Sequence, residues 1–150
     1  MRGAEPASTF ASRPAHLALI TADESVTYDE LDRRSAEMAQ ALLAAGAGKG
    51  TRIGLLAPDG VLWLTTFYAA LRIGALITPI STLAAPPELA HIIRRSDVQI
   101  LVGVRSFLRR DVGDLLTAAL PELTTQRDGS LQLCSAPLLR SIWLDDAEGA

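Results

Sequence analysis

The sequence predicts an α/β fold, a mostly parallel sheet with flanking helices, and three observations lead to it. Short apolar runs that lack the alternation of a half-exposed strand are typical of strands buried on both faces. Longer amphipathic segments separate these runs, and glycine or proline marks many of the boundaries. Strands that alternate with helices at these lengths imply right-handed crossover units, which place the strands parallel in one sheet.

A leader and a short hairpin open the chain. Residues 1–15 are rich in alanine, serine and proline, and we expect them to be disordered. Strands are predicted over residues 16–21 and 25–27, joined by polar turn residues. The leader carries Arg2 and Arg13 but no apolar run of signal-peptide length. We therefore expect a cytoplasmic protein.

The longest predicted helix follows the hairpin directly. Thr27 followed by Glu30 predicts a capping box, in which a hydroxyl and a carboxylate satisfy free backbone amides, so that the helix begins at Tyr28. Gly46 and Gly48 offer the positive φ angles that end a helix. The residues that recur on its apolar face are Leu31, Ser35, Met38, Ala39 and Leu42.

A buried strand and a second helix come next. The mostly apolar residues 52–57 predict a strand buried on both faces. A turn follows, in which Asp59 is expected to cap a helix over residues 61–73. The side chains expected to share the core face of this helix are Trp63, Phe67, Ala70 and Leu71.

Residues 61–80 are also long enough to span a bilayer, so a transmembrane helix is the alternative to a helix followed by a strand. Arg72 near the middle of this run would cost about 2.5–3.5 kcal/mol on insertion scales. Gly74 and Pro79 interrupt the run as a helix stop and a strand-end breaker. We therefore expect no transmembrane segment.

The remaining residues continue the alternation. Residues 76–80 and 98–102 are predicted strands, and a helix over residues 86–95 separates them because proline suits the first turn of a helix. A further helix over residues 111–120 ends at Pro121. The last predicted elements are a polar connection at 124–130, a strand at 139–144 and a linker at 145–150.

Composition excludes several classes of function. The 150 residues carry a formal net charge of −3, which argues against a nucleic-acid-binding surface. Cys134 is the single cysteine, so no disulfide framework is expected. The two histidines, His16 and His91, stand too far apart in sequence for a spaced zinc site. We therefore expect no metal ligands in this chain.

Several segments of the chain resemble the beginning of adenylate-forming enzymes, the acyl-CoA synthetases and their relatives. Three of them are Thr27-Tyr28-Asp29-Glu30-Leu31, residues 50–58 (GTRIGLLAP), and residues 69–75 (AALRIGA) followed by Pro79. The similarity continues through Pro87-Glu88-Leu89, and the phrase PLLRSI at residues 137–142 favours the acyl-CoA synthetase branch. The resemblance covers residues 10–144, roughly the whole chain, as the first α/β part of the large N-terminal domain of such an enzyme.

The resemblance implies that the full-length enzyme joins a carboxylic acid to ATP, releases pyrophosphate and passes the acyl-adenylate to coenzyme A. It thus implies ATP, Mg and CoA as cofactors, a small carboxylic acid as substrate, and fatty acid metabolism as a setting. The phosphate loop of the family and its C-terminal domain match nothing in this chain, whose only lysine is Lys49. We predict that the chain holds no catalytic residue and is inactive alone.

One loop remains as a candidate binding site. Ser81, Thr82 and Leu83 follow a predicted strand, at the position where α/β proteins bind ligands. In some CoA ligases of the family the matching loop approaches the CoA nucleotide. This loop is uncharged, so a phosphate contact would need a cation from nearby, such as Arg94 or Arg95. An ordinary connecting loop is the simpler interpretation.

The other polar residues fit structural roles better than chemistry. Lys49 lies between two glycines in a turn, and Arg72 complements the dipole at a helix C-terminus. His91 has no second ligand at metal-binding spacing. The arginine pairs at 33–34, 94–95 and 109–110 are expected to be solvated helix ends.

Alternatives to the acyl-CoA synthetase stay open at this point. The chain also fits the start of a peptide-synthetase adenylation domain, in which a carrier protein replaces CoA. A stand-alone binding or interaction module from a truncated gene is a further alternative. Because apolar strand edges and helix faces would be left exposed, we expect the isolated chain to be marginally stable and to self-associate.

Overall fold

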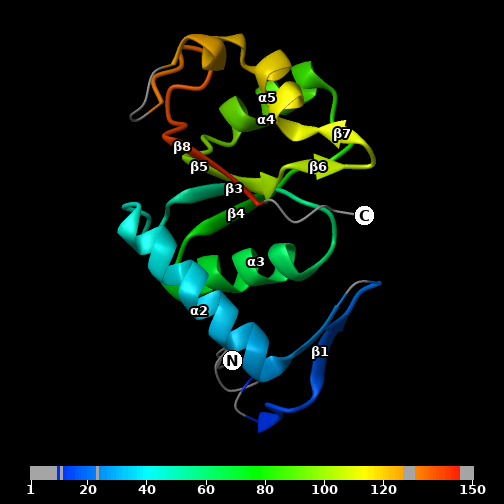
Figure 1. Cartoon of the computed structure of the whole chain (residues 1–150). Coiled ribbons are helices and arrows are strands. Elements are labelled where there is room, and N and C mark those ends of the chain that lie inside the picture. Colours follow the sequence, from blue (N-terminus) through cyan, green and yellow to red (C-terminus); the bar gives the residue numbers. More distant parts are fainter. Residues whose placement is uncertain (1–9, 11, 23, 127–130, 146–150) are drawn as a thin grey trace. The chain divides into compact units, whose positions relative to one another are not determined.

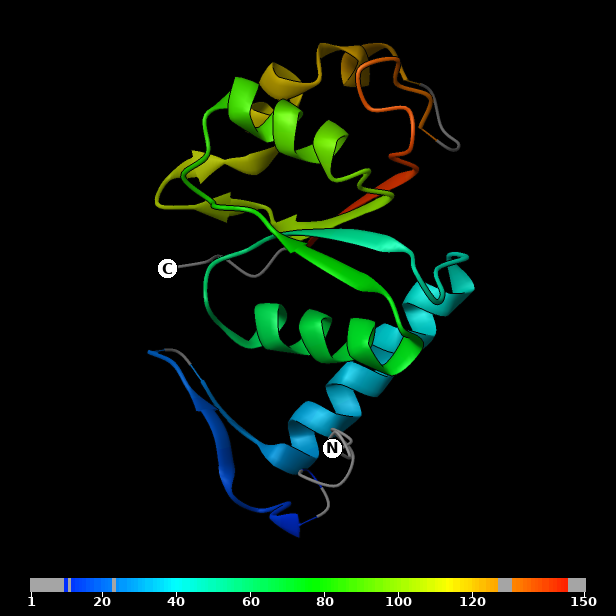
Figure 2. The same cartoon turned by 180° about the vertical axis from the view of Figure 1, so that it is seen from behind.

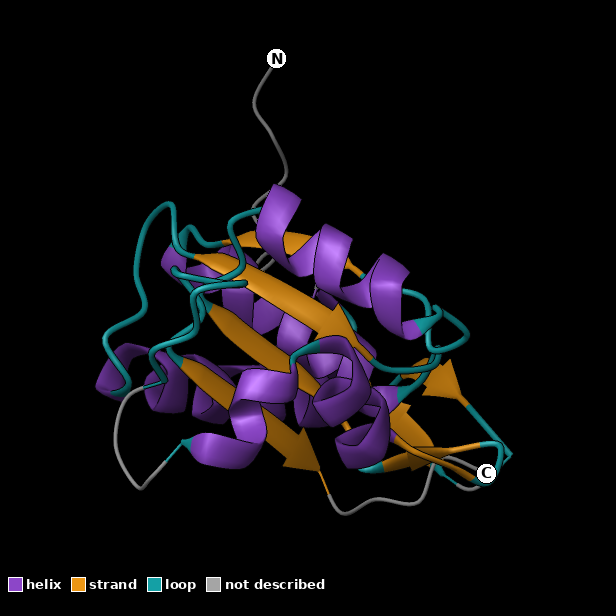
Figure 3. Ribbon diagram, turned by 90° about the horizontal axis from the view of Figure 1, so that it is seen from above, coloured by secondary structure: helices purple, strands orange, loops and turns teal. Residues whose placement is uncertain are grey.

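The computed structural model describes residues 10, 12–22, 24–126 and 131–145. These residues form an α/β structure with helices and a parallel four-stranded sheet, which confirms the predicted fold class (Figures 1 and 3). The chain divides into two compact units. The first unit comprises Met1–Lys49 and Asp59–Ala75, and the second comprises Gly50–Pro58 and Leu76–Ala150.

The first unit begins with the predicted antiparallel hairpin, β1 (Leu17–Ile20) and β2 (Ser25–Thr27). Its turn is closed by hydrogen bonds in both directions: the Thr21 amide donates to the Glu24 carbonyl at 2.9 Å, and the Glu24 amide donates to the Thr21 hydroxyl at 3.1 Å. Local side-chain bonding of this kind is typical of Ser/Thr turns.

The helix α2 (Tyr28–Ala44) begins at the predicted residue. The Thr27 hydroxyl accepts a hydrogen bond from the Glu30 amide at 3.3 Å, as expected of an N-cap. The reciprocal half of the predicted capping box is not formed, because the Glu30 carboxylate instead accepts hydrogen bonds from Arg33 and Arg34. Thr27 alone therefore caps α2.

The C-terminal end of α2 follows the prediction at one glycine and departs from it at the other. Gly46 adopts a φ of 82°, as predicted, whereas the second positive φ of this turn lies at Gly50 and not at Gly48. Four of the five residues predicted on the apolar face of α2 are buried, and Met38 is half-buried. The buried four are Leu31, Ser35, Ala39 and Leu42.

The helix α3 (Val61–Ile73) has the predicted bounds but not the predicted cap, and its predicted face is confirmed only in part. Gly60 occupies its N-cap without a side-chain hydrogen bond, so the expectation for Asp59 was wrong. Of the residues predicted on its core face, Ala70 is buried, Trp63 and Phe67 are half-buried, and Leu71 is 45% exposed. The other buried side chains of the helix are Thr65, Thr66 and Ala69. Periodicity fails here because α3 is apolar on nearly every side, so the pattern does not select a face. Gly74 ends the helix in the left-handed conformation, as predicted.

A small aromatic cluster completes the first unit, in which α2 and α3 pack against each other (Figure 2). Phe10, from the segment predicted as a leader, is 4% exposed and packs with Val26 and Leu31. Its ring lies 5.0 Å from that of Tyr68 in an edge-on arrangement and 6.0 Å from that of Tyr28. Phe10 is therefore part of the folded unit. The other residues of the leader up to 9 lie outside the described residues.

The second unit is built on the predicted parallel sheet, with strand order β4-β3-β5-β8 (Figure 3). All three strand pairs are parallel. β5 and β8 each start two residues after the predicted position, since turn residues precede them. The strands are β3 (Arg52–Leu56), β4 (Leu76–Pro79), β5 (Ile100–Val104) and β8 (Ser141–Asp145).

Two helices lie on one face of this sheet (Figures 1 and 2). α4 (Pro86–Arg95) has the predicted bounds, and α5 (Val112–Ala119) is capped by Asp111, which accepts from the Asp114 amide at 2.9 Å. A 3₁₀-helix η1 (Pro121–Thr125) takes part of the predicted polar connection. The rest of that connection, residues 127–130, and the linker beyond Asp145 lie outside the described residues.

The hairpin after β5 was not predicted. A short hairpin of β6 (Ser106–Phe107) and β7 (Arg110–Asp111) follows β5. Its turn residues Leu108 and Arg109 have φ angles of 48° and 63°, a conformation that normally selects glycine or asparagine. No helix in the described part of the chain is long and apolar enough to cross a membrane.

Candidate functional site

The candidate loop at residues 81–85 lies at the carboxyl end of β4, as predicted. Two hydrogen bonds close it into a turn: the Ala84 amide donates to the Ser81 carbonyl at 3.1 Å, and the Leu83 amide donates to the Ser81 hydroxyl at 3.2 Å. At the start of α4, the Glu88 carboxylate accepts from the Ala85 amide at 3.4 Å. Hydrogen bonds within the loop and to the first turn of α4 therefore stabilise its conformation.

Arg110 of the unpredicted hairpin holds the same loop from outside. Its guanidinium donates to the Thr82 carbonyl at 3.3 Å and to the Ala84 carbonyl at 2.9 Å. The hairpin itself follows the carboxyl end of β5. Loop and hairpin thus meet beside the carboxyl ends of two parallel strands, where ligands of α/β proteins bind.

The cations nearest to this loop are not those that the sequence suggested. Arg94 and Arg95 lie at the C-terminal end of α4, which is about 15 Å long at 1.5 Å per residue, while the loop lies at its N-terminal end. Arg109 and Arg110 lie in the hairpin instead, so their expected place at a helix end was wrong. The sequence could not indicate that this arginine pair lies near the loop, because Arg110 contacts Thr82 and Ala84, which are far from it in sequence.

The exposed surface of this region is apolar and basic. Leu83 is 68% exposed and Leu108 is 64% exposed, and both lie on the turns that Arg110 joins or adjoins. Ser81 and Arg109 are exposed beside them. Such a surface offers flat apolar contact, a hydroxyl and a cation, which suits binding of an anionic organic group and supplies no nucleophile paired with a base.

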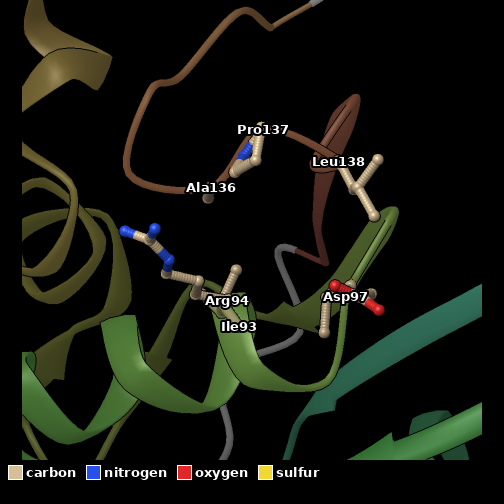
Figure 4. Close-up of a pocket in the computed structure, with 7 residues that line it drawn as sticks. Ile93, Arg94, Asp97, Ala136, Pro137 and Leu138 are labelled. Carbon is tan, nitrogen blue, oxygen red and sulfur yellow. The ribbon is translucent and has the colours of Figure 1, made fainter.

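A pocket elsewhere in the second unit is too small for a nucleotide. It has a volume of about 160 Å³ and is lined by Ile93, Arg94, Asp97, Val98, Ala136, Pro137 and Leu138. Ligand pockets typically measure roughly 300–1,000 Å³. Figure 4 shows the Arg94 guanidinium and the Asp97 carboxylate pointing in opposite directions, so they do not converge on a ligand. Asp97 instead binds Arg52 at 2.9 Å.

Arg72 has a structural role in the first unit, as expected, through partners on α2. Its guanidinium donates to the Ser35 hydroxyl at 3.1 Å and to the Asp32 carbonyl at 3.2 Å, and it forms an ion pair with the Asp32 carboxylate. It also lies over the Phe10 ring, 5.8 Å from the centroid. These contacts use several donors of the guanidinium, which therefore fastens α3 to α2.

The strongest electrostatic perturbation lies on the outer surface of α2. The Glu30 carboxylate accepts hydrogen bonds from Arg33 and Arg34, which lower its pKa from 4.5 to about 2. The same contacts raise the pKa of both arginines. A half-buried acid with two bound arginines stays charged, so this cluster is a surface ion-pair network and not an acid–base pair.

The described residues offer no cluster of metal-ligating side chains. No group of three or more His, Cys, Asp or Glu side chains among them is arranged to hold a metal. Lys49, the only lysine of the chain, is exposed in its turn, and His91 is exposed on α4.

Comparisons with known proteins agree with the fold and with the segments that resemble adenylate-forming enzymes. The sequence profile of the AMP-binding enzyme family matches residues 7–148. The long-chain-fatty-acid–CoA ligase FadD13 of Mycobacterium tuberculosis is 34% identical over 80 residues, which make up 53% of this chain and 16% of that ligase. Phosphinothricin tripeptide synthetase PhsC of Streptomyces viridochromogenes is 31% identical over 107 residues, 71% of this chain and 10% of the synthetase.

A solved structure shares the fold over nearly the whole chain. The anthranilate CoA ligase AuaEII, solved in complex with anthranoyl-AMP, superimposes with a TM-score of 0.75 at 23% identity and covers 97% of this chain and 25% of its own. The chain spans about a quarter or less of the length of the curated relatives it matches. The profile match over residues 7–148 shows that the chain belongs to the AMP-binding enzyme family, the adenylate-forming enzymes.

Proposed function

We propose that the chain forms the N-terminal α/β part of an ATP-dependent acyl-CoA synthetase. Such an enzyme converts a carboxylic acid, ATP and CoA into acyl-CoA, AMP and pyrophosphate through an acyl-adenylate. The family match over residues 7–148 carries this proposal, and the acyl-CoA ligases among the relatives support it. A fatty or other small carboxylic acid is the proposed substrate, and the cytoplasm is the proposed location.

Within such an enzyme this chain supplies scaffold and not chemistry. This part of the proposal is supported by the described residues, among which no group of three or more His, Cys, Asp or Glu side chains could hold a metal ion. The matched part of this chain makes up 24% of the length of one relative and 20% of the length of another. We assign adenylation to the three quarters of the family enzymes that this chain does not match.

The loop of Ser81, Thr82 and Leu83 is the part of this chain that we propose to face CoA. It lies at a strand end, and Arg110 holds two of its carbonyls. Arg109, exposed in the neighbouring turn, supplies the positive charge that the loop lacks. A phosphate group of CoA would then meet a guanidinium, and its apolar portions would meet Leu83.

An NMR titration of the 150-residue chain with CoA tests this assignment. We expect the amide signals of residues 81–83 to shift, and Arg109→Ala to weaken the binding severalfold. Arg95→Ala is the matched control, because Arg95 is an exposed arginine of the same unit at the far end of α4. Shifts confined to other segments, or equal weakening by both variants, would contradict the assignment.

A peptide-synthetase adenylation domain is the second candidate. The 31% identity to the phosphinothricin tripeptide synthetase over 107 residues supports it, since in that class a carrier protein takes the place of CoA. The two candidates share the acid and ATP and differ only in the thiol that accepts the acyl group. The acceptor thiol is thus the property that separates them.

Extension of the coding sequence past Ala150 tests the proposed function itself. We expect an in-frame Ser/Thr/Gly-rich phosphate loop with a lysine, and acid-dependent acyl-CoA formation by the encoded protein. Acyl transfer to a carrier protein and not to CoA would favour the peptide-synthetase candidate. A stop codon together with independent expression of the short product would contradict both and favour a stand-alone binding module.

A further inference from the structure

Two sets of hydrogen bonds hold the loop at residues 81–85, one from within and one from outside. Within the loop, the Leu83 amide donates to the Ser81 hydroxyl at 3.2 Å and the Ala84 amide donates to the Ser81 carbonyl at 3.1 Å. The carbonyls of Thr82 and Ala84 accept from a donor outside the loop. Because the loop contains no proline, which would restrict its backbone, its conformation depends on that outside contact.

Arg110 is the outside donor, and the groups that it contacts are neutral. Its half-buried guanidinium donates to the Thr82 carbonyl at 3.3 Å and to the Ala84 carbonyl at 2.9 Å. Among the residues that the structure describes, it forms no ion pair with a carboxylate. The planar fork of a guanidinium suits two carbonyl groups at a fixed spacing. The contact therefore holds the geometry of the loop and does not neutralise an acid.

The β6–β7 hairpin presents Arg110 from a fixed base. Arg110 pairs with Phe107 on the neighbouring strand, and the Val112 amide donates to the Arg105 carbonyl at 2.9 Å, which closes the hairpin. The next residue, Asp111, caps α5, whose first residue Val112 is buried. The guanidinium therefore starts from an ordered part of the second unit, as is required of a residue that supports a binding loop.

The turn of the hairpin adopts an unfavourable backbone conformation. Leu108 and Arg109 have φ angles of 48° and 63°, in the left-handed region that is costly for residues with a Cβ. Asparagine and glycine would form the same turn with less strain. Strain of this kind is concentrated at ligand sites and at segments that position them. The turn therefore favours a role for the hairpin besides chain reversal.

We propose that Arg110 is a positioning residue for CoA. By holding the carbonyls of Thr82 and Ala84, it keeps residues 81–83 in the conformation that binds CoA, and it does not touch CoA itself. The apparent affinity for a ligand falls with the fraction of the protein that is in the binding conformation. The hairpin thus sets the affinity for CoA through the loop. This inference rests on the proposed CoA-facing loop and deepens it.

CoA titration combined with amide hydrogen exchange tests the proposal on the 150-residue chain. We expect Arg110→Ala to weaken CoA binding severalfold, because the loop then holds its binding conformation for only part of the time. The amides of Leu83 and Ala84 should lose most of their protection from exchange, and saturating CoA should restore it. Exchange in β5 is the control for an intact sheet, and we expect no change there.

Two further variants separate positioning from charge. Arg110→Lys keeps the charge but not the fork of donors, so we expect it to recover only part of the affinity for CoA. Arg109→Ala should weaken CoA binding and leave the protection of the loop amides unchanged, because Arg109 is exposed in the turn. Faster loop exchange together with weaker binding is thus the signature expected of Arg110 alone among the arginines of this hairpin.

The titration distinguishes failure of this inference from failure of the proposed CoA site. If CoA leaves the amide signals of residues 81–83 of the wild-type chain unshifted, the CoA-facing loop is wrong, and the role of Arg110 is wrong with it. If the wild type binds CoA there and Arg110→Ala or Arg110→Lys binds equally tightly, the loop stands and positioning by Arg110 is overturned. Loss of protection in β5 of Arg110→Ala would also overturn it, since Arg110 would then stabilise the whole sheet.

Discussion

The two compact units differ in the kind of contact that stabilises each of them internally. In the first unit, a guanidinium, a hydroxyl, a carboxylate and a ring join α3 to α2 through Arg72, Ser35, Asp32 and Phe10. In the second unit, apolar strands touch directly, and the backbone of Leu56 lies against Gly103 on the neighbouring strand. Directional polar contacts are sensitive to the loss of a donor, whereas close packing is sensitive to added volume.

The sheet unit should therefore show the largest response to a single added carbon. A Cβ at Gly103 would lie 2.6 Å from the Leu56 carbonyl oxygen and 3.3 Å from the Leu56 Cβ. Since a backbone oxygen on a central strand has little room to move, we expect Gly103→Ala to lower the free energy of unfolding by about 3 kcal/mol or more. Chemical denaturation of the two proteins measures the difference.

Gly48→Ala in the first unit is the matched control for this substitution. Nothing lies within 4 Å of the Cβ that it adds, and its φ is not positive. We expect a change within about 0.5 kcal/mol, as for an unremarkable surface site. Equal effects of the two alanine substitutions would show that close strand packing does not distinguish the sheet unit.

The first unit should respond most to the loss of Arg72. Arg72→Ala removes the donor to the buried Ser35 hydroxyl and the ion pair with Asp32, and we expect a loss of about 1.5–3 kcal/mol, the range for hydrogen bonds to charged groups. Arg72→Lys should recover only part of this, because an ammonium lacks the planar fork of donors. Thermal unfolding of the three proteins measures the order. If Arg72→Lys is as stable as the wild type, the positive charge alone accounts for the stabilisation, and the guanidinium hydrogen bonds do not contribute.

The parts of the fold that the sequence predicts well are those with local end signals. Caps, glycines and prolines mark the bounds of α3 and α4, and both helices have the predicted limits. The buried face of α3 was predicted only in part, with Ala70 buried and Leu71 exposed, since an almost wholly apolar helix carries no directional pattern. The β6–β7 hairpin was missed because its turn uses Leu108 and Arg109 where a glycine or asparagine would be the usual signal.

The candidate site was predictable in position but not in composition. Its place follows from the end of β4, which hydrophobic patterning locates well. Arg110 was missed because it reaches residues 26 and 28 positions earlier in the sequence, and no local pattern encodes such a contact. Arg94 and Arg95 were favoured only for their nearness in sequence, and the length of α4 separates them from the loop.

Arg110 offers a smaller test within the sheet unit, where it makes a polar contact in otherwise apolar surroundings. We expect Arg110→Ala to lower the free energy of unfolding by about 1 kcal/mol and to speed amide hydrogen exchange in residues 82–85. Arg109→Ala, one residue away and exposed, should leave that exchange unchanged. Loop exchange unaffected by Arg110→Ala would mean that the local bonds of Ser81 suffice to hold the loop.

The smallest expected effect concerns the ion pairs on the surface of α2. The pKa of Glu30 falls from 4.5 to about 2 in the folded chain, so its contribution to stability is full above pH 4.5 and is lost as the pH falls toward 2. We expect Glu30→Gln to lower the melting temperature slightly at pH 7 and not at pH 2. High salt should shrink the difference at pH 7, since the carboxylate remains partly accessible to solvent. If Glu30→Gln lowers the melting temperature equally at pH 2, the loss of stability comes from the N-terminal cap of α2 and not from the charge of Glu30.

The central claim is that this chain is scaffold of an adenylate-forming enzyme and holds none of its chemistry. Exchange of labelled pyrophosphate into ATP, measured on the purified 150-residue chain with a panel of carboxylic acids and magnesium, tests the claim most directly. We predict no acid-dependent exchange above a blank without protein. Clear exchange that depends on both the acid and the chain would contradict the claim, because it would require a phosphate-binding and adenylating site within these residues.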